Sequence, residues 1–113
     1  MNSVCFLDLG ATYRELKTEI DATVARVLGS GWYLLGTELE AFESEYADYI
    51  GARYCIGVGN GLDALHLTLL AMGIGPGDEV LVPSNTYIAT WLAVSQTGAI
   101  PVPIEPDERT YNI

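Results

Sequence analysis

The chain has 113 residues and half of them are apolar, so a small globular fold with a hydrophobic core is expected rather than disorder. Fifteen acidic residues against five basic ones give a formal net charge of −10, which argues against nucleic acid and anionic membranes as partners. Neither a basic leader nor a run of roughly 18 apolar residues is found, so a cytoplasmic protein is expected. Cys5 and Cys55 lack metal-site spacing and are expected to be buried thiols.

Two amphipathic helices are predicted in the first half of the chain. Each segment begins with a capping-box pattern, a threonine followed three residues later by a glutamate: Thr12 with Glu15, and Thr37 with Glu40. Apolar residues then recur at helical spacing, and each pattern stops at a glycine suited to a helix C-terminus, Gly29 or Gly51. The acidic residues between them are most simply solvated helix faces.

From Tyr54 onward the pattern alternates between strands and helices. In chain order it predicts strand Tyr54–Val58, helix Gly61–Met72, strand Glu79–Pro83, a helix capped by Thr86 and running through Thr97, and strand Ala99–Ile104. Pro101 and Pro103 argue against the last strand, because neither can donate to a ladder. The fold class is therefore α/β, a parallel βαβαβ unit preceded by two helices, with a helical segment at 1–53 and an α/β domain at 54–113. Since three parallel strands leave open edges, we expect this domain to be incomplete and the chain to be a fragment.

The stretch GVGNGLDALHL, residues 57–67, places three glycines between the first predicted strand and the first predicted helix of this unit. Ligands of open α/β sheets bind where strands end and helix N-termini point free amides outward. A phosphate would rest there on the amides of Gly61, Leu62 and Asp63. An ordinary turn capped by Asn60 is an equally good interpretation, and the spacing matches dinucleotide-binding and Walker patterns poorly or not at all.

Residues Gly59–Asp107 resemble the nucleotide-sugar aminotransferases of the DegT/StrS family through three motifs in order: GNGLDAL, GIGPGDEV and PSNTYIAT. Upstream, FLDL at 6–9, SGWYLLG at 30–36 and ELEAFE at 38–43 are similar to the opening segment of that family. The resemblance implies a fold-type-I enzyme that uses pyridoxal 5′-phosphate (PLP). It also implies that this chain is about the first third of the full-length protein and includes the N-terminal part of its large PLP-binding domain.

The resemblance also implies roles for single residues. The amides of Gly61, Leu62 and Asp63 would hold the PLP phosphate, although many relatives carry a hydroxyl residue at the position of Leu62. Tyr87 would stack on the pyridine ring, with Asn85 as a polar neighbour. From the residues alone, without the resemblance to the family, Tyr87 is predicted to be a core aromatic at the start of a helix. Four further residues are interpreted as structural rather than functional: His66, Trp91, Trp32 and Tyr33.

A PLP aminotransferase needs a lysine that binds the cofactor covalently and a carboxylate on the pyridine nitrogen. The only lysine here, Lys17, lies in the first predicted helix, so no catalytic residue is expected in this chain. The resemblance implies that the full enzyme is a homodimer in deoxyamino-sugar biosynthesis, which moves an amino group from glutamate to a nucleotide-linked keto-sugar. Three alternatives stay open: a PLP-dependent sugar dehydratase on the same scaffold, a small nucleotide-binding α/β module, and a non-catalytic regulatory remnant.

Overall fold

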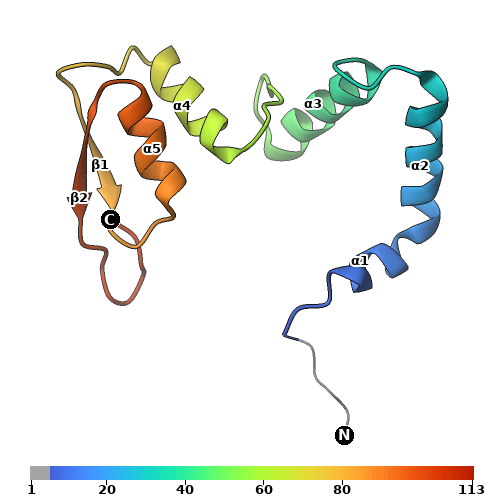
Figure 1. The fold of residues 1–113 in the computed structure, drawn as a ribbon, viewed down its shortest axis with the longest axis horizontal. Helices are drawn as coiled ribbons and strands as arrows, with labels where there is room; N and C mark the ends of the chain where they lie inside the picture. Colours follow the sequence, from blue (N-terminus) through green and yellow to red (C-terminus); the bar gives the residue numbers. More distant parts are fainter. Residues whose placement is uncertain (1–5) are drawn as a thin grey trace, which may run out of the picture. The chain divides into compact units, whose positions relative to one another are not determined.

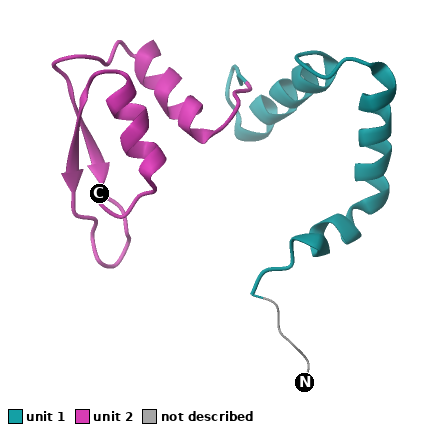
Figure 2. Cartoon of the chain, viewed as in Figure 1, with its two compact units in different colours: residues 1–56 teal, residues 57–113 magenta. Residues whose placement is uncertain are grey.

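The computed structural model describes residues 6–113, so the prediction for Cys5 lies outside the described residues. The chain divides into two compact units, residues 1–56 and residues 57–113 (Figure 2). The first unit is helical, and the second combines helices with a two-stranded parallel sheet (Figure 1).

Over residues 6–56, the first unit contains three helices where the sequence predicted two: α1 (Leu9–Glu15), α2 (Lys17–Ser30) and α3 (Thr37–Ile50). The predicted start at Thr12 is wrong, because α1 begins one turn earlier, after Asp8. Leu16 separates α1 from α2 with φ −100° and ψ 14°, so the apolar stripe that runs across both helices comes from two helices rather than one.

Glycines end α2 and α3, but only one of them was predicted correctly. Gly51 closes α3 with φ 70°, as expected. Gly29 remains inside α2, and Gly31 ends that helix with φ 69°, since a left-handed cap suits a residue without a Cβ. The capping box at Thr37 is also wrong: Gly36 is the N-cap of α3 and Thr37 is its first residue.

The second unit contains α4 (Gly61–Ala71), β1 (Glu79–Pro83), α5 (Ile88–Gln96) and β2 (Ile100–Ile104). β1 and β2 pair in parallel, with Glu79 opposite Ile100 and Pro83 opposite Ile104, so the parallel pairing is confirmed. Tyr87, not Thr86, is the N-cap of α5, and the Thr86 hydroxyl instead lies 2.8 Å from that of Thr90.

The predicted strand at Tyr54–Val58 is wrong, because this segment is irregular in the structure. A strand needs a neighbour that completes its ladder, and in the described residues the sheet consists of β1 and β2, which pair with each other. Tyr54 and Ile56 accordingly remain 72% and 79% exposed. The predicted βαβαβ unit is thus a βαβ unit preceded by α4.

β2 forms despite its two prolines because of its register. The Ile100 amide donates to the Asp78 carbonyl, and the Ile104 carbonyl accepts from the Ser84 amide. In a parallel strand alternate residues face the same neighbour, so residues 100, 102 and 104 face β1. Pro101 and Pro103 fall on the outer edge, where a missing N–H breaks no bond with β1.

The core of the second unit is small and lies between α5 and the sheet. Val82, Val94 and Ala99 are buried together, and four partly buried side chains pack against them: Leu69, Ile74, Val80 and Trp91. α4 packs on α5, which itself contacts both strands. Trp91 is therefore a core residue, as predicted. No helix within residues 6–113 has both the length and the apolar character needed to cross a membrane.

Candidate functional site

The N-terminus of α4 is closed by a reciprocal pair of hydrogen bonds between Asn60 and Asp63. The Asp63 amide donates to Asn60 Oδ1 at 2.9 Å, and Asn60 Nδ2 donates to Asp63 Oδ2, also at 2.9 Å. Asn60 adopts the extended backbone expected of an N-cap. The sequence suggested this cap as the structural alternative to a phosphate cradle, and the cap is present.

The cap leaves the amides of Gly61 and Leu62 as the open donors of the first turn. They precede the first intrahelical bond, and no hydrogen bond within residues 6–113 occupies them. A Cβ placed on Gly61 would meet no atom within 4 Å, so the space in front of this residue is open. Two adjacent amides at the positive end of a helix can bind an anionic group.

The carboxylate of Asp63 disfavours the binding of an anion at the same helix end. A Cβ placed on Gly59 would lie 3.0 Å from Asp63 Oδ2, so the carboxylate occupies the space beside that glycine. Its hydrogen bond to Asn60 holds it there. An anion at Gly61 and Leu62 would therefore share the helix end with a carboxylate already in place.

Tyr87 lies in the connection between β1 and α5, and its side chain is 78% exposed. The alternative interpretation of Tyr87 as a core aromatic is therefore wrong. Figure 1 shows α4 and α5 running the same way, with both N-termini toward the end at which the strand arrows finish. The first turn of α4 and the Tyr87 connection thus share one end of the unit, the end at which α/β sheets bind ligands.

A pocket of about 240 Å³ lies at the carboxyl ends of the two strands, lined by Asn85, Glu105, Pro106, Asp107, Glu108 and Tyr111. Ser84 Oγ donates to Glu105 Oε2 at 3.0 Å and joins the residues that directly follow β1 and β2. Asn85 was predicted from the sequence as a polar neighbour of the cofactor site, but the other residues of this lining were not. The available signal was the polar residue that follows each predicted strand.

The loop behind this pocket is organised by Asp107. Its Oδ1 accepts hydrogen bonds from the Arg109 amide at 2.9 Å and the Thr110 amide at 3.0 Å. These backbone donors, together with the Thr110 hydroxyl, lower the pKa of Asp107 below its ordinary value of 3.8. Tyr111 has a φ of 56°, unusual for a residue with a side chain, and its amide donates to the Asp107 carbonyl.

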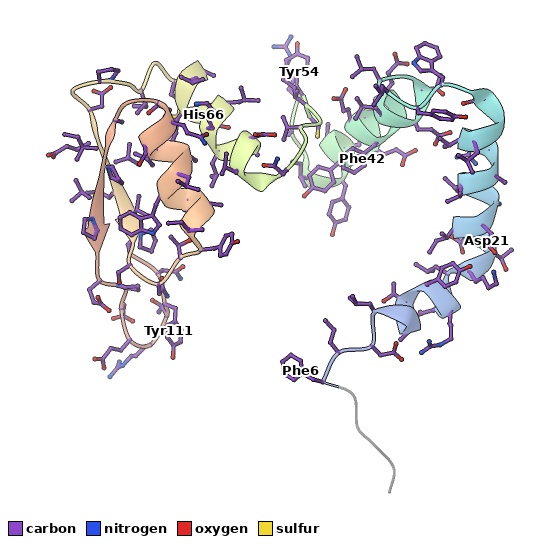
Figure 3. The ribbon with its side chains drawn as sticks, in the orientation of Figure 1. Phe6, Asp21, Phe42, Tyr54, His66 and Tyr111 are labelled. Atoms are coloured by element: carbon purple, nitrogen blue, oxygen red, sulfur yellow. The ribbon has the colours of Figure 1, made fainter. Side chains whose placement is uncertain are left out.

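Figure 3 labels one of the remaining candidates, His66, on α4. His66 is half-buried on α4, and its imidazole has no hydrogen-bond partner within residues 6–113. Trp32 and Tyr33 are 64% and 63% exposed, so both are less buried than the structural interpretation implied. Cys55 is a half-buried free thiol.

The Lys17 ammonium group has two hydrogen-bond partners. Its ammonium donates to Asp21 Oδ2 and to the Tyr13 hydroxyl. These bonds raise the pKa of Lys17 above its ordinary value, the hydrogen bond to Asp21 contributing most. A nucleophilic lysine needs the opposite shift, because only the neutral amine attacks. No group of residues within 6–113 is arranged to hold a metal ion.

Comparison with known proteins finds one family. Residues 14–113 match the model of the DegT/DnrJ/EryC1/StrS aminotransferase family. The chain is 64% identical over 105 residues to dTDP-3-amino-3,4,6-trideoxy-alpha-D-glucose transaminase of Streptomyces venezuelae, covering 93% of this chain and 28% of the relative.

Two solved structures are similar over nearly the whole chain. DesV of S. venezuelae, solved in complex with a ketimine intermediate, superposes with a TM-score of 0.93 at 60% identity, covering 98% of this chain and 30% of that one. NtdA of Bacillus subtilis, solved with bound cofactor PMP, gives a TM-score of 0.82 at 36% identity over 96% of this chain and 25% of that one. The chain thus spans about 30% of the length of the relatives that it matches.

Proposed function

The chain belongs to the DegT/DnrJ/EryC1/StrS aminotransferase family, and from this membership we propose that it forms part of a PLP-dependent sugar aminotransferase. The whole protein would move an amino group from glutamate to a nucleotide-linked keto-sugar. The observation that carries the proposal is the similarity to DesV, with a TM-score of 0.93 at 60% identity. The family membership extends over both units of the chain, since the match begins at Arg14.

The residues present are compatible with a PLP phosphate at the N-terminus of α4. Gly61 and Leu62 offer two open amides, and the absence of a Cβ at Gly61 leaves room for the phosphate. The positive end of the helix dipole favours the dianion. We propose the amides of Gly61, Leu62 and Asp63 as its ligands, with Gly61 and Leu62 binding first. The Asp63 amide joins them only if the Asn60 side chain releases it, since Asn60 Oδ1 accepts from it at 2.9 Å.

Tyr87 is proposed to lie against the pyridine ring. Its exposed side chain is available for a flat partner, which a core aromatic would not be. The ring of bound PLP supplies an electron sink for the electrons released at the substrate carbon. The residues of this chain contribute binding and orientation to that chemistry: amides for the phosphate, and an aromatic face for the ring.

The lysine that binds the cofactor covalently is proposed to come from outside these 113 residues. Lys17 is the only lysine in the sequence, and its hydrogen bond to Asp21 raises its pKa above the ordinary value. The proposal therefore assigns no catalytic residue to this chain. Residues 1–53 would be a helical segment and 54–113 an incomplete PLP-binding domain, in an enzyme that works as a homodimer.

A graft tests the proposal. In the graft, this chain replaces the matching segment of the S. venezuelae transaminase, which is 64% identical to it. We expect the graft to retain PLP after dialysis, seen by its visible absorbance, and to form amino-sugar from glutamate and the dTDP-linked keto-sugar. The native transaminase is the positive control. A folded graft that holds no PLP would refute the proposal.

A further inference from the structure

The connection between α2 and α3, residues 31–36, holds Trp32 in one defined pose. Trp32 Nε1 donates to the Leu34 carbonyl at 2.8 Å. A Cβ placed on Gly36 would lie 3.2 Å from Cε2 and 3.3 Å from Cδ2 of Trp32, so one face of the indole rests on the backbone of Gly36. The side chain is nevertheless 64% exposed, which leaves much of the ring open to a partner.

The backbone of this connection is unusual at two successive residues. Leu35 has a φ of 50°, which L side chains rarely adopt, and Gly36 has a φ of 135°. Strain of this kind persists only where the surrounding contacts enforce it, and it is concentrated at ligand-binding and active sites. The hydrogen bond and ring contact of Trp32 are such contacts. These two contacts fix the position of the Trp32 ring, and a fixed ring in a strained connection indicates a functional role for Trp32.

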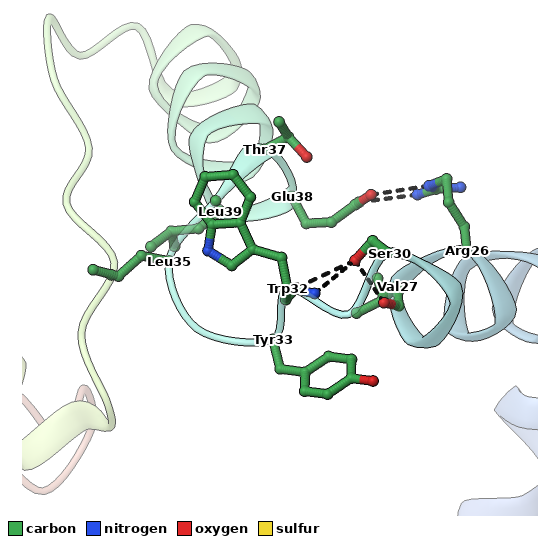
Figure 4. Close-up of a pocket in the computed structure, with 10 residues that line it drawn as sticks. Arg26, Val27, Ser30, Trp32, Tyr33, Leu35, Thr37, Glu38 and Leu39 are labelled. Atoms are coloured by element: carbon green, nitrogen blue, oxygen red, sulfur yellow. Dashed lines mark hydrogen bonds and ion pairs between the residues drawn. The ribbon is translucent and has the colours of Figure 1, made fainter.

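Trp32 borders a pocket of about 210 Å³ that also touches Arg26, Val27, Thr37, Glu38 and Leu39 (Figure 4). Pockets for drug-sized ligands are larger, about 300–1,000 Å³, so this one suits a single ring rather than a whole nucleotide-sugar. Figure 4 shows the indole on the α3 side of the connection, with Tyr33 pointing the other way. Two aromatic residues line the pocket, Trp32 and Tyr33, and the indole is the one that lies on the side of α3.

The polar groups of the pocket favour a neutral ring over a phosphate. Arg26 Nε and Nη2 donate to the two Glu38 carboxylate oxygens, each at 2.9 Å. The third nitrogen of Arg26 points away from Glu38 and from the indole (Figure 4). Glu38 and Glu40 lie in the first turn of α3, where they disfavour a phosphate at that helix end.

From these contacts we infer that the Trp32 pocket binds the flat heterocyclic base of a nucleotide, which stacks on the indole. The inference rests on the proposed function and adds to it the part of the substrate that this pocket recognises. Base–aromatic stacking tolerates different bases, because each presents a π face. The pocket would thus contribute affinity for the nucleotide rather than chemistry.

The test is titration calorimetry of dTDP into the graft and three variants. Trp32→Ala should weaken dTDP binding at least about 5-fold, the lower end for removing one base–aromatic stack. Trp32→Phe should retain most of the affinity. Tyr49→Ala, which removes an 85% exposed aromatic from α3 away from the pocket, is the matched control and should bind like the graft.

Ribose 5-phosphate, which lacks a base, separates the base from the phosphate. Its binding should be the same in the graft and in Trp32→Ala. Equal dTDP affinity in both proteins would overturn the inference, as would an equal loss of affinity for ribose 5-phosphate. A lower melting temperature of Trp32→Ala with unchanged dTDP affinity would overturn it too, in favour of a purely structural role. PLP absorbance of the same preparations reports separately on the proposed function.

Discussion

Gly61 is the residue on which the proposed phosphate site depends most directly. A Cβ there meets nothing within 4 Å, so Gly61→Val should leave the fold intact while filling the space in front of the helix. We expect this variant of the graft to lose PLP on dialysis, measured by visible absorbance. Ala64→Val, an exposed substitution one turn further along α4, is the matched control. Full PLP retention by Gly61→Val would exclude the phosphate from this helix end.

Tyr87 allows a cleaner separation of binding from stability than most aromatic residues do. Its ring is 78% exposed, so Tyr87→Ala should change the free energy of unfolding by no more than about 0.5 kcal/mol. An aromatic stack contributes about 0.5–1.5 kcal/mol, which predicts PLP binding about 2- to 10-fold weaker and slower transamination. Tyr54→Ala removes a 72% exposed ring from the other unit and should change neither stability nor PLP affinity. Unaltered PLP affinity in Tyr87→Ala would contradict the stacking role.

At the scale of elements, α4 depends on its cap. Asn60 satisfies the Asp63 amide and holds the Asp63 carboxylate, both at 2.9 Å. Asn60→Ala should destabilise the graft by about 1 kcal/mol, the usual cost of losing an N-cap, and should speed hydrogen exchange in the first turn of α4. Asn60→Ser keeps a capping oxygen and should recover most of both effects. Unchanged exchange in Asn60→Ala would show that the cap contributes nothing.

The loop after β2 should respond to acid. Its backbone donors bind the Asp107 carboxylate and lower the pKa of that group below 3.8. The carboxylate's contribution to stability is therefore complete above the ordinary pKa and is lost as the pH falls through the lowered one. Urea unfolding of the graft and of Asp107→Asn should differ by a constant amount above about pH 5, and this difference should shrink below about pH 4. A difference independent of pH would contradict the role of the carboxylate.

At the scale of the whole molecule, the 113 residues by themselves have little core. Val82, Val94 and Ala99 form the buried cluster of the second unit, and Leu81 and Ile100 in the strands are more than half exposed. Exposed apolar strands promote association, although Pro101 and Pro103 remove donors from the outer edge of β2. We predict that the isolated chain is poorly folded or aggregated and has no transaminase activity.

Expression of the chain alone tests this prediction. The purified chain is incubated with PLP, glutamate and a nucleotide-linked keto-sugar, and its size is measured by light scattering. With Lys17 as the only lysine, no covalent link to PLP is expected at the proposed site. A soluble monomer that forms amino-sugar would contradict both the stability argument and the assignment of the lysine to a part of the protein outside these residues.

Much of the second unit follows from local sequence signals. The bounds of β1 were predicted correctly, and those of α4 and β2 to within one residue, because each apolar run is flanked by turn or capping residues. The family was also recognisable from the order of three motifs, and the match over residues 14–113 confirms it. Such signals suffice where the ends of an element are marked by turn and capping residues that adjoin it in the sequence.

Tertiary structure decided the features that depend on distant partners. The apolar run at Tyr54–Val58 is not a strand, since a ladder needs a neighbour and the described sheet consists of β1 and β2. Pro101 and Pro103 are tolerated in β2 because the register turns them away from β1. Whether Tyr87 is core or exposed was likewise invisible in the sequence. Tyr87 lies in the connection before α5, outside the core cluster of Val82, Val94 and Ala99, and that placement becomes visible only once the unit is packed.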